Sequence, residues 1–251
     1  MAQTAARTAI YGLYGVYAWL LLAVFVPIAL LGAIGMPTLT MRRRSARWVA
    51  RNFLRCAGIR LALVGAERLP DTQCVVVANH ASYIDGLVMT AILPPRFAYV
   101  VKREMDRVPL AGLLLRRLGT EFVERFNRHK GASDARRVLR TATSGQSMVF
   151  FPEGTFESAP GVLKFHNGAF ATAVRAICPV VPVAIRGSRH VMSGHRLSLR
   201  PGRIEVSVLT PLAIATADAA RGEHLAMRLR DQARAMIIAE VGEPDAHAGG
   251  G

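Results

Sequence analysis

A histidine and an aspartate five positions apart, His80 and Asp85, are the residues of this sequence best suited to chemistry. They follow the apolar run CVVVA at residues 74–78, and Asn79 stands directly before the histidine. A carboxylate that accepts a hydrogen bond from one imidazole nitrogen fixes the tautomer and raises the basicity of the other nitrogen. His80 can then act as a general base toward an alcohol. A second interpretation is that Ser82 and Asp85 cap the next helix and that the spacing to His80 is accidental.

Short apolar runs alternate with amphipathic stretches from residue 60 onward, and these elements must position His80. We expect strands at 60–65, 73–78, 97–101, 120–124, 147–151, 180–186 and 203–209. We expect helices near 83–93, 109–118, 132–143 and 167–177, and a last helix over 218–241 that begins at Asp218. This alternation predicts an α/β fold with a largely parallel sheet flanked by helices. Sites in such sheets gather past the carboxyl ends of strands, which is where His80 is expected.

The segment from residue 10 to residue 36 is apolar and uncharged, and it is long enough to cross a bilayer as a helix. Aromatic rings gather toward its beginning, where they would lie at the level of the lipid headgroups. Pro27 is expected to kink or break the helix. Two geometries remain open, one tilted span or a two-helix membrane motif that dips into one leaflet. A buried core helix and a cleaved signal peptide are the alternatives.

The positive charge of the chain is concentrated next to this apolar segment. The formal net charge is +15, yet residues 1–60 contain eight arginines and no acidic residue. Arg44, Arg47, Arg51 and Arg55 have the spacing of one helix face. The pattern favours a basic helix on anionic headgroups at the cytoplasmic side of a membrane. A nucleic-acid-binding arm is the rival interpretation, and it is disfavoured because few aromatic residues are interleaved with the arginines.

The change in composition near residue 60 predicts three segments. Residues 1–60 form a membrane-associating helical part, residues 61–241 form the α/β domain, and residues 242–251 form a disordered tail.

Several chemistries lack support in the sequence. No Walker A loop, GxGxxG fingerprint or GxSxG nucleophile elbow is present. The three cysteines are far apart and form no zinc-like spacing, and we interpret His190 and His195 as loop residues rather than metal ligands. We therefore expect no metal site.

Three further blocks accompany the NHxxxxD block of Asn79, His80 and Asp85. They are GTEFVER at 119–125, FFPEGT at 150–155 and VVPVAI at 180–185, and a segment with Lys102, Pro109 and Gly112 connects the first two. In this order the blocks resemble those of glycerolipid acyltransferases of the 1-acylglycerol-3-phosphate acyltransferase type, over roughly residues 60–212. The resemblance implies the α/β fold of these acyltransferases, and it implies a membrane-bound enzyme of phospholipid biosynthesis.

The resemblance also implies a reaction and a set of roles. A fatty acyl group passes from acyl-coenzyme A or acyl carrier protein to the free hydroxyl of a lysolipid, and no other cofactor is needed. His80 removes the hydroxyl proton, and Asp85 orients the imidazole. The resemblance assigns substrate binding to Asn79, Glu153, Gly154 and Thr155, and it makes Arg125 a candidate phosphate ligand with Lys102 or Lys164 as substitutes.

One departure bears on the acceptor. The family pattern often continues FPEGT with arginine and serine, whereas Phe156 and Glu157 follow Thr155 here. The expected acceptor is 1-acyl-sn-glycerol 3-phosphate, which yields phosphatidic acid. Another lysolipid, such as a lyso-ornithine lipid or another lysophospholipid, is the close alternative. A non-catalytic, membrane-bound lipid-binding module is the other class, and the intact His80 and Asp85 disfavour it.

Overall fold

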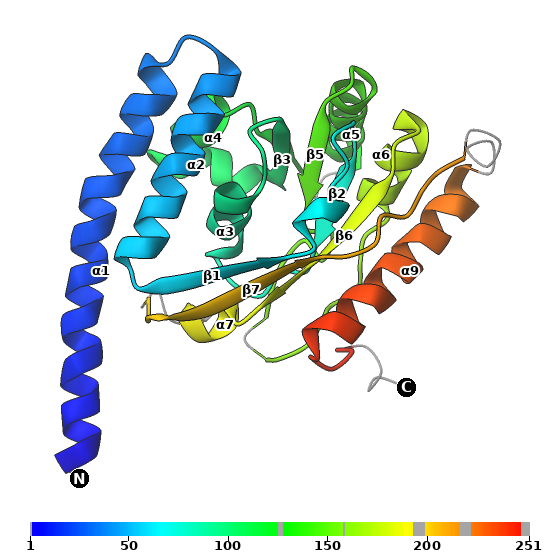
Figure 1. The fold of residues 1–251 in the computed structure, drawn as a ribbon. Helices are drawn as coiled ribbons and strands as arrows, with labels where there is room; N and C mark the ends of the chain where they lie inside the picture. Colours follow the sequence, from blue (N-terminus) through cyan, green and yellow to red (C-terminus); the bar gives the residue numbers. More distant parts are fainter. Residues whose placement is uncertain (1, 125–127, 158, 193–198, 216–221, 247–251) are drawn as a thin grey trace.

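The computed structural model describes residues 2–124, 128–157, 159–192, 199–215 and 222–246. A twisted sheet forms its centre, with helices on both faces, and one long helix, α1, runs along the outside (Figure 1). The strands are β1 (Ile59–Val64), β2 (Val75–Ala78), β3 (Phe97–Lys102), β4 (Glu121–Val123), β5 (Ser147–Phe150), β6 (Val180–Arg186) and β7 (Gly202–Val208). All seven expected strands are present.

The sheet has the strand order β1-β7-β6-β2-β5-β3-β4. Every neighbouring pair is parallel except β6 and β7, which run antiparallel. The expected α/β fold with a largely parallel sheet is therefore confirmed. Because β3, β5, β2 and β6 are parallel neighbours, the loops that follow them meet at one edge of the sheet.

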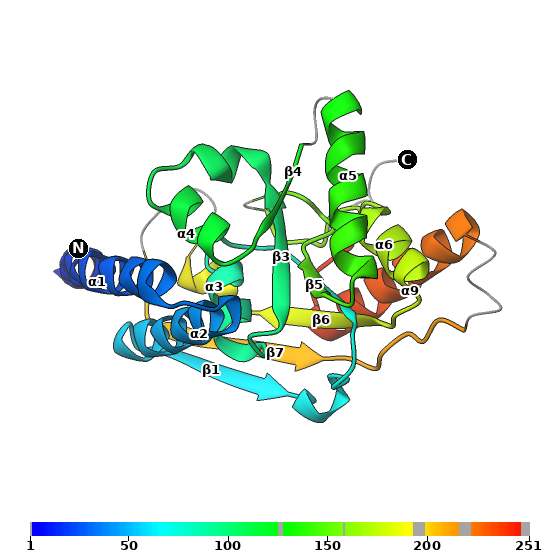
Figure 2. The same cartoon turned by 90° about the horizontal axis from the view of Figure 1, so that it is seen from above.

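Helices cover both faces, and the strand residues alternate between two cores. Val76 and Ala78 of β2 belong to the core beneath α1, α2 and α3, whereas Val75 and Val77 belong to the core beneath α5, α6 and α9 (Figure 2). Successive side chains of a strand point to opposite faces of the sheet, which explains this division. The longer helices are α1 (Ala2–Gly35), α2 (Leu39–Cys56), α3 (Asp85–Ile92), α4 (Ala111–Arg117), α5 (Arg128–Thr143), α6 (Gly168–Ala176) and α9 (Gly222–Val241). Short turns of helix are η1 (Ala66–Arg68), η2 (Arg103–Arg107) and α7 (Ser188–Val191).

Helix α1 packs antiparallel along α2 and leaves its outer face bare (Figure 1). Its segment Leu13–Gly35 is apolar and long enough to cross a membrane, and most of its residues are not buried. Of the kink or break expected at Pro27, the break is wrong, because the helix continues through this residue. The hydroxyl groups of Tyr14 and Tyr17 donate to the carbonyls of Ala57 and Cys56, so these rings tie α1 to the end of α2.

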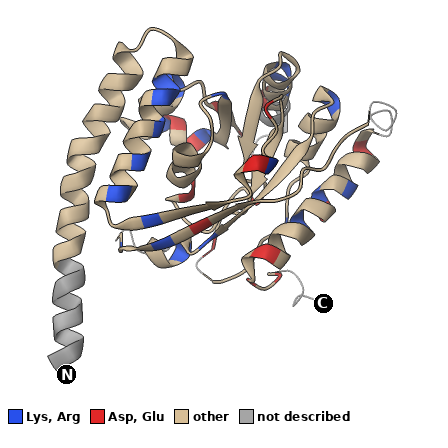
Figure 3. Cartoon of the chain, in the orientation of Figure 1, with Lys and Arg blue, Asp and Glu red and all other residues tan. Residues whose placement is uncertain are grey.

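The arginines of α2 serve the fold as well as the surface. The guanidinium groups of Arg47 and Arg51 donate to carbonyls in the last turn of α3, at 2.8 Å to Ile92 and 2.7 Å to Ala91. Arg43 is buried and donates to the carbonyl of Leu118 at 2.9 Å. Cations at helix carboxyl ends satisfy carbonyls that lack helical partners. Arg44, Arg51 and Arg55 are exposed and Arg47 is half-buried, so most of the expected basic stripe faces outward. Figure 3 shows the basic residues along α2.

The end of the chain extends the ordered structure beyond α9. Asp218, the expected start of the last helix, lies outside the described residues. The sequence predicts a disordered tail from residue 242, but residues 242–246 are held in place. Asp245 forms a bridge with Val162 and an ion pair with Arg234, and Glu243 accepts a hydrogen bond from the Gly161 amide. Residues 247–251 lie outside the described part.

Candidate active site

The loops after β2 and β5 form the centre of the site. His80 follows β2, and residues 151–157 follow β5, which is the parallel neighbour of β2. Helix α3 begins at Asp85, five residues after His80. Strand β6, on the other side of β2, supplies the backbone that anchors the first loop.

The structure brings His80 and Asp85 into direct contact. The Nδ1 atom of His80 lies 2.9 Å from Oδ2 of Asp85, and the Asp85 side chain is completely buried. The same oxygen accepts hydrogen bonds from the amides of Ala81 at 2.7 Å and Ser82 at 2.8 Å. These two backbone donors fix the carboxylate, so the imidazole donates from Nδ1 and keeps the lone pair of Nε2 available as a base. Asp85 thus fixes the loop and orients His80 at once.

Ser82 does not cap α3 in the expected way. The residue before the helix is Ile84, whose own side chain makes no capping hydrogen bond. The Ser82 hydroxyl accepts from the amide of Ile84 at 3.3 Å and donates to the carbonyl of Met192 at 2.5 Å, beyond α7. This contact joins the catalytic loop to the segment that follows β6.

Asn79 holds the loop to the sheet. Its amide group donates to the carbonyl of Ile185 at 3.0 Å, and its oxygen accepts from the amide of Ile185 at 2.7 Å. The side chain is buried, and both of its polar ends contact β6 backbone. The structure therefore gives Asn79 a positioning role, where the resemblance implies substrate binding.

Glu153 links the loop after β5 to His80. One carboxylate oxygen accepts from the amide of His80 at 2.6 Å, and the other accepts from the amide of Leu163 at 2.7 Å. The side chain is buried, and this burial raises the pKa of Glu153 to about 7, although the two amide hydrogen bonds oppose the shift. Glu153 thus fixes the backbone of His80.

We expect Glu153→Gln to change the pH dependence of stability. Because its pKa is raised in the folded state, Glu153 holds a proton there that the unfolded chain releases. The contribution of Glu153 to the free energy of unfolding therefore falls as the pH rises from about 4.5 to about 7. The full effect is about 3 kcal/mol, from about 1.4 kcal/mol for each pKa unit. Glutamine lacks this titration, so the wild-type-minus-variant difference in the free energy of unfolding should decline as the pH rises. Urea unfolding at pH 5, 6, 7 and 8 measures it, and a constant difference would contradict the assignment.

Aromatic rings enclose the imidazole. Phe151 stacks on His80 with ring centroids 4.5 Å apart, and Phe156 packs edge-on against the imidazole with ring centroids 4.6 Å apart. Tyr83 contacts Phe156 edge-on at 4.8 Å. About one fifth of the His80 side chain remains exposed. The ring is therefore shielded yet open to a substrate.

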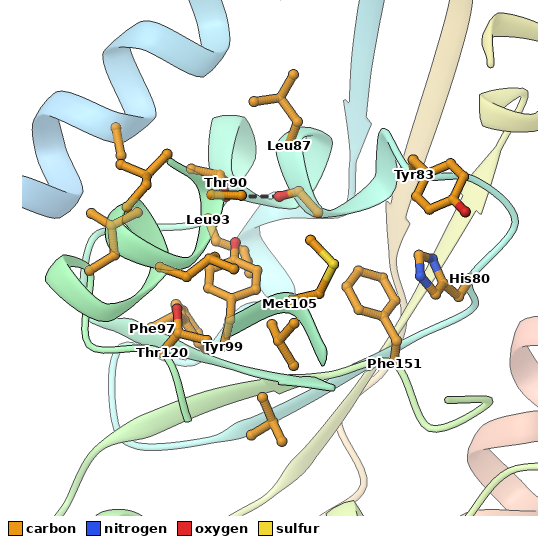
Figure 4. A pocket seen from close by; sticks show the side chains of 18 of the residues that line it. His80, Tyr83, Leu87, Thr90, Leu93, Phe97, Tyr99, Met105, Thr120 and Phe151 are labelled. Atoms are coloured by element: carbon orange, nitrogen blue, oxygen red, sulfur yellow. Dashed lines mark hydrogen bonds between the residues drawn. The ribbon is translucent and has the colours of Figure 1, made fainter. Parts of the chain in front are cut away.

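A cavity of about 720 Å³ begins at His80 and extends between α3, α4 and the sheet (Figure 4). Leu87, Leu93, Phe97 and Leu114 give it an apolar wall. At the far side Arg43, Arg47 and Tyr99 add polar atoms, and the fully buried Tyr99 hydroxyl has its pKa raised by burial. A long apolar cavity with a base at its mouth suits an acyl chain whose carbonyl reacts at the entrance.

The other expected site residues divide into three groups. Lys102, Gly154 and Thr155 line the cavity, as do Phe156 and Glu157. Lys164 is exposed and lies outside the linings of the cavities described here. Arg125 lies outside the described residues.

Sequence reasoning missed the residues that shape the cavity. Leu87 and Thr90 lie on one face of α3, and Tyr83 precedes the helix by two residues at a spacing that continues this face, so the spacing of the three residues is a signal. Tyr99 and Arg43 carry no such signal, because they reach the cavity from elements distant in sequence.

The comparisons with known proteins agree with this geometry. The model of the family described as Acyltransferase matches residues 60–186. The chain belongs to the Acyltransferase family. A 1-acyl-sn-glycerol-3-phosphate acyltransferase alpha from Mus musculus is 36% identical over 159 residues, which are 62% of this chain and 56% of the mouse protein. The 1-acyl-sn-glycerol-3-phosphate acyltransferase of Saccharomyces cerevisiae is 28% identical over 87% of this chain and 77% of the yeast protein.

A solved structure shares the fold. The crystal structure of the 1-acyl-sn-glycerophosphate acyltransferase PlsC from Thermotoga maritima matches 94% of this chain and 97% of its own chain, with a TM-score of 0.75 and 20% identity. This structure confirms the fold, and the family model with the mouse and yeast relatives confirms the resemblance inferred from the four blocks.

Proposed function

We propose that this protein transfers a fatty acyl group from an acyl thioester to the free hydroxyl of 1-acyl-sn-glycerol 3-phosphate and so makes phosphatidic acid. The observation that carries the proposal is the His80–Asp85 pair at the mouth of an apolar cavity. The relatives from mouse and yeast, both named 1-acyl-sn-glycerol-3-phosphate acyltransferases, support the same reaction. The chain spans 56% of the length of the mouse protein.

His80 and Asp85 can carry the transfer without a covalent enzyme intermediate. The Nε2 atom of His80 takes the proton of the lysolipid hydroxyl while the hydroxyl oxygen forms a bond to the thioester carbonyl carbon. The carbon–sulfur bond then breaks, and the thiolate leaves with the proton that His80 returns. The buried carboxylate of Asp85 stabilises the imidazolium between these two steps.

The 720 Å³ cavity holds the acyl chain of the donor in this scheme. A methylene group has roughly the size of a water molecule, about 30 Å³, so the cavity admits a chain of ordinary fatty-acid length. The donor is acyl-coenzyme A or acyl carrier protein, and the basic surface suits the acidic groups of either one.

The acceptor phosphate needs a cation close to the cavity. Lys102 is exposed at the end of β3 and lines the cavity, which makes it the candidate that the described residues favour. Phe156 packs against His80 and Tyr83 where the family pattern often has arginine. This packing is why another lysolipid, such as a lyso-ornithine lipid, is the second candidate acceptor.

Residues 1–60 supply the membrane association in our proposal. The outer face of α1 exposes Leu13, Leu20, Val24 and Leu31, which suits contact with lipid chains. The exposed Arg44, Arg51 and Arg55 of α2 suit anionic headgroups at the cytoplasmic face of the inner membrane. The enzyme then meets a lysolipid that is itself confined to the membrane.

Thiol release from palmitoyl-coenzyme A by the purified protein in nanodiscs tests the proposal. The acceptors are 1-oleoyl lysophosphatidate, a lyso-ornithine lipid and two other lysophospholipids, and palmitoyl-acyl carrier protein is the second donor. We expect the highest kcat/KM with lysophosphatidate. Preference for another lysolipid would move the assignment to the second acceptor, and no turnover with either donor would favour a lipid-binding module.

We expect Gly86→Leu to shorten the preferred donor chain. Gly86 lines the 720 Å³ cavity, and a Cβ added there meets no atom within 4 Å, so a leucine side chain can extend into the cavity. The kcat/KM for palmitoyl-coenzyme A should fall about tenfold, the order expected for one or two methylene groups that no longer fit. Octanoyl-coenzyme A should react as in the wild type, which shows that the neighbouring Asp85 is undisturbed. Equal losses with both donors would contradict the placement of the donor chain.

A further inference from the structure

A second apolar cavity lies on the other side of α3. It measures about 530 Å³, and helix α1 supplies Gly15, Ala18, Trp19 and Leu22 to its wall. Phe53 of α2 and Leu199 close it from the other sides. None of the described residues that line it carries a charge. The cavity therefore lies between the candidate membrane helix and the catalytic domain.

The two cavities adjoin beside the catalytic histidine. Tyr83 and Leu87 line both of them. Tyr83 packs edge-on against Phe156, and Phe156 packs against His80. The ring of Phe156 therefore connects the shared wall to the imidazole of His80. A molecule bound at His80 can thus send one chain into each cavity.

We propose that the 530 Å³ cavity holds the acyl chain that the lysolipid acceptor already carries. The inference rests on the proposed acyltransferase function. It assigns the two apolar cavities to the two chains of the product, the 720 Å³ cavity to the incoming chain and the 530 Å³ cavity to the resident one.

The chemistry of the product suits two such cavities. In phosphatidic acid the two acyl chains leave from neighbouring carbons of one glycerol, so both must find apolar surroundings within reach of His80. At roughly 30 Å³ for each methylene-sized group, 530 Å³ accommodates a chain of about 16 to 18 carbons. The volumes thus suit two fatty-acid chains.

The position of the cavity selects the acceptor rather than the donor. Its wall includes four residues of α1, the helix that is apolar and long enough to cross a membrane. A lysolipid lies in the membrane with its chain among the lipids, and it can move that chain along α1 into the cavity while its headgroup stays near His80. The donor thioester carries a large water-soluble group, and it enters from the side of residues 154–157, which line the 720 Å³ cavity.

Gly15 offers a selective way to fill the cavity. A Cβ added at Gly15 meets nothing within 4 Å, so Gly15→Leu places a side chain in the cavity without a clash. Gly35, at the end of the same helix, has equally open surroundings and lines neither of the two cavities, which makes Gly35→Leu the matched control. Leucine favours helix more than glycine does, so both variants should fold.

The experiment measures KM for lysophosphatidates with acyl chains of 6, 12 and 18 carbons, with one saturating donor. For Gly15→Leu we expect KM to rise about tenfold for the 18-carbon acceptor and to stay unchanged for the 6-carbon acceptor. Its dependence on donor chain length should match that of the wild type, in contrast to Gly86→Leu. An unchanged acceptor dependence, or an altered donor dependence, would overturn the assignment.

A binding measurement separates this inference from the proposed function. Trp19 lines the cavity, and the only other tryptophan, Trp48, lies on α2 outside the two linings, so Trp48→Phe leaves Trp19 as the sole tryptophan fluorophore. Lysophosphatidate with a dibrominated chain should quench Trp19 in detergent, and unlabelled lysophosphatidate should reverse the quenching. Gly15→Leu in that background should weaken the quenching. Quenching without turnover would retain the lipid site and reject the acyltransferase, whereas turnover without quenching would reject the site alone.

Discussion

His80→Ala should lower kcat by about 10²- to 10⁴-fold, the contribution typical of a positioned general base. His80 is the only described histidine at the 720 Å³ cavity, and its Nδ1 is already engaged by Asp85. Removal of the imidazole takes away the acceptor of the hydroxyl proton and leaves both apolar cavities in place. We therefore expect KM for the donor and the acceptor to change little. Steady-state thiol release at saturating palmitoyl-coenzyme A and lysophosphatidate measures the loss.

The matched control for this variant is His190→Ala. His190 is exposed on α7 and lines neither cavity, so its replacement should leave kcat near the wild-type value. Thermal unfolding of both variants shows whether the fold survives. If His80→Ala retains more than a tenth of wild-type kcat with its fold intact, His80 is not the general base.

Asp85→Asn should lower kcat by about 10²-fold, because the variant loses the charge that stabilises the imidazolium. The amides of Ala81 and Ser82 both donate to Oδ2, so the asparagine oxygen should occupy that place and still accept from His80. Its amide group then takes the place of Oδ1, which has no hydrogen-bond partner among the described residues. The tautomer of His80 is preserved, and the variant isolates the effect of charge.

A double variant tests whether Asp85 acts through His80. Residues that act as one unit show strongly non-additive effects. His80→Ala with Asp85→Asn should therefore be as slow as His80→Ala alone. Asp71→Asn serves as the control, since Asp71 is exposed and lines neither cavity. A further hundredfold loss in the double variant would show that Asp85 contributes independently of the histidine.

The periodicity of the sequence was sufficient for the architecture of the sheet. All seven strands appear at the expected places, because continuous apolar runs such as VVVA are required for strands that are buried on both faces. The antiparallel direction of β7 was not predictable from its residues, since the apolar pattern of a strand is the same in either direction. The continuation of α1 through Pro27 likewise departs from the local expectation, and contact with α2 along the helix accompanies it.

Local spacing made His80 and Asp85 candidates, and the resemblance to a known family supplied their proposed roles. His80 and Asp85 lie on one short loop, so the loop itself brings them within 2.9 Å. Glu153 and Asn79 were recognised as important, yet their partners were not. Glu153 bonds the His80 amide across 73 positions of the sequence, and Asn79 bonds Ile185 across 106. Such contacts depend on the order of strands in the sheet, which residue types do not encode.

By itself the sequence determined the fold class, the order of the strands along the chain and the pairing of His80 with Asp85 on one loop. Only the tertiary structure decided where the substrates have room. The 720 Å³ cavity takes residues from Ala29 to Ala159, and the 530 Å³ cavity takes residues from Gly15 to Leu199. A cavity is the space that packed elements leave between them. Its walls come from segments far apart in the chain, so its shape exists only once those segments have packed together.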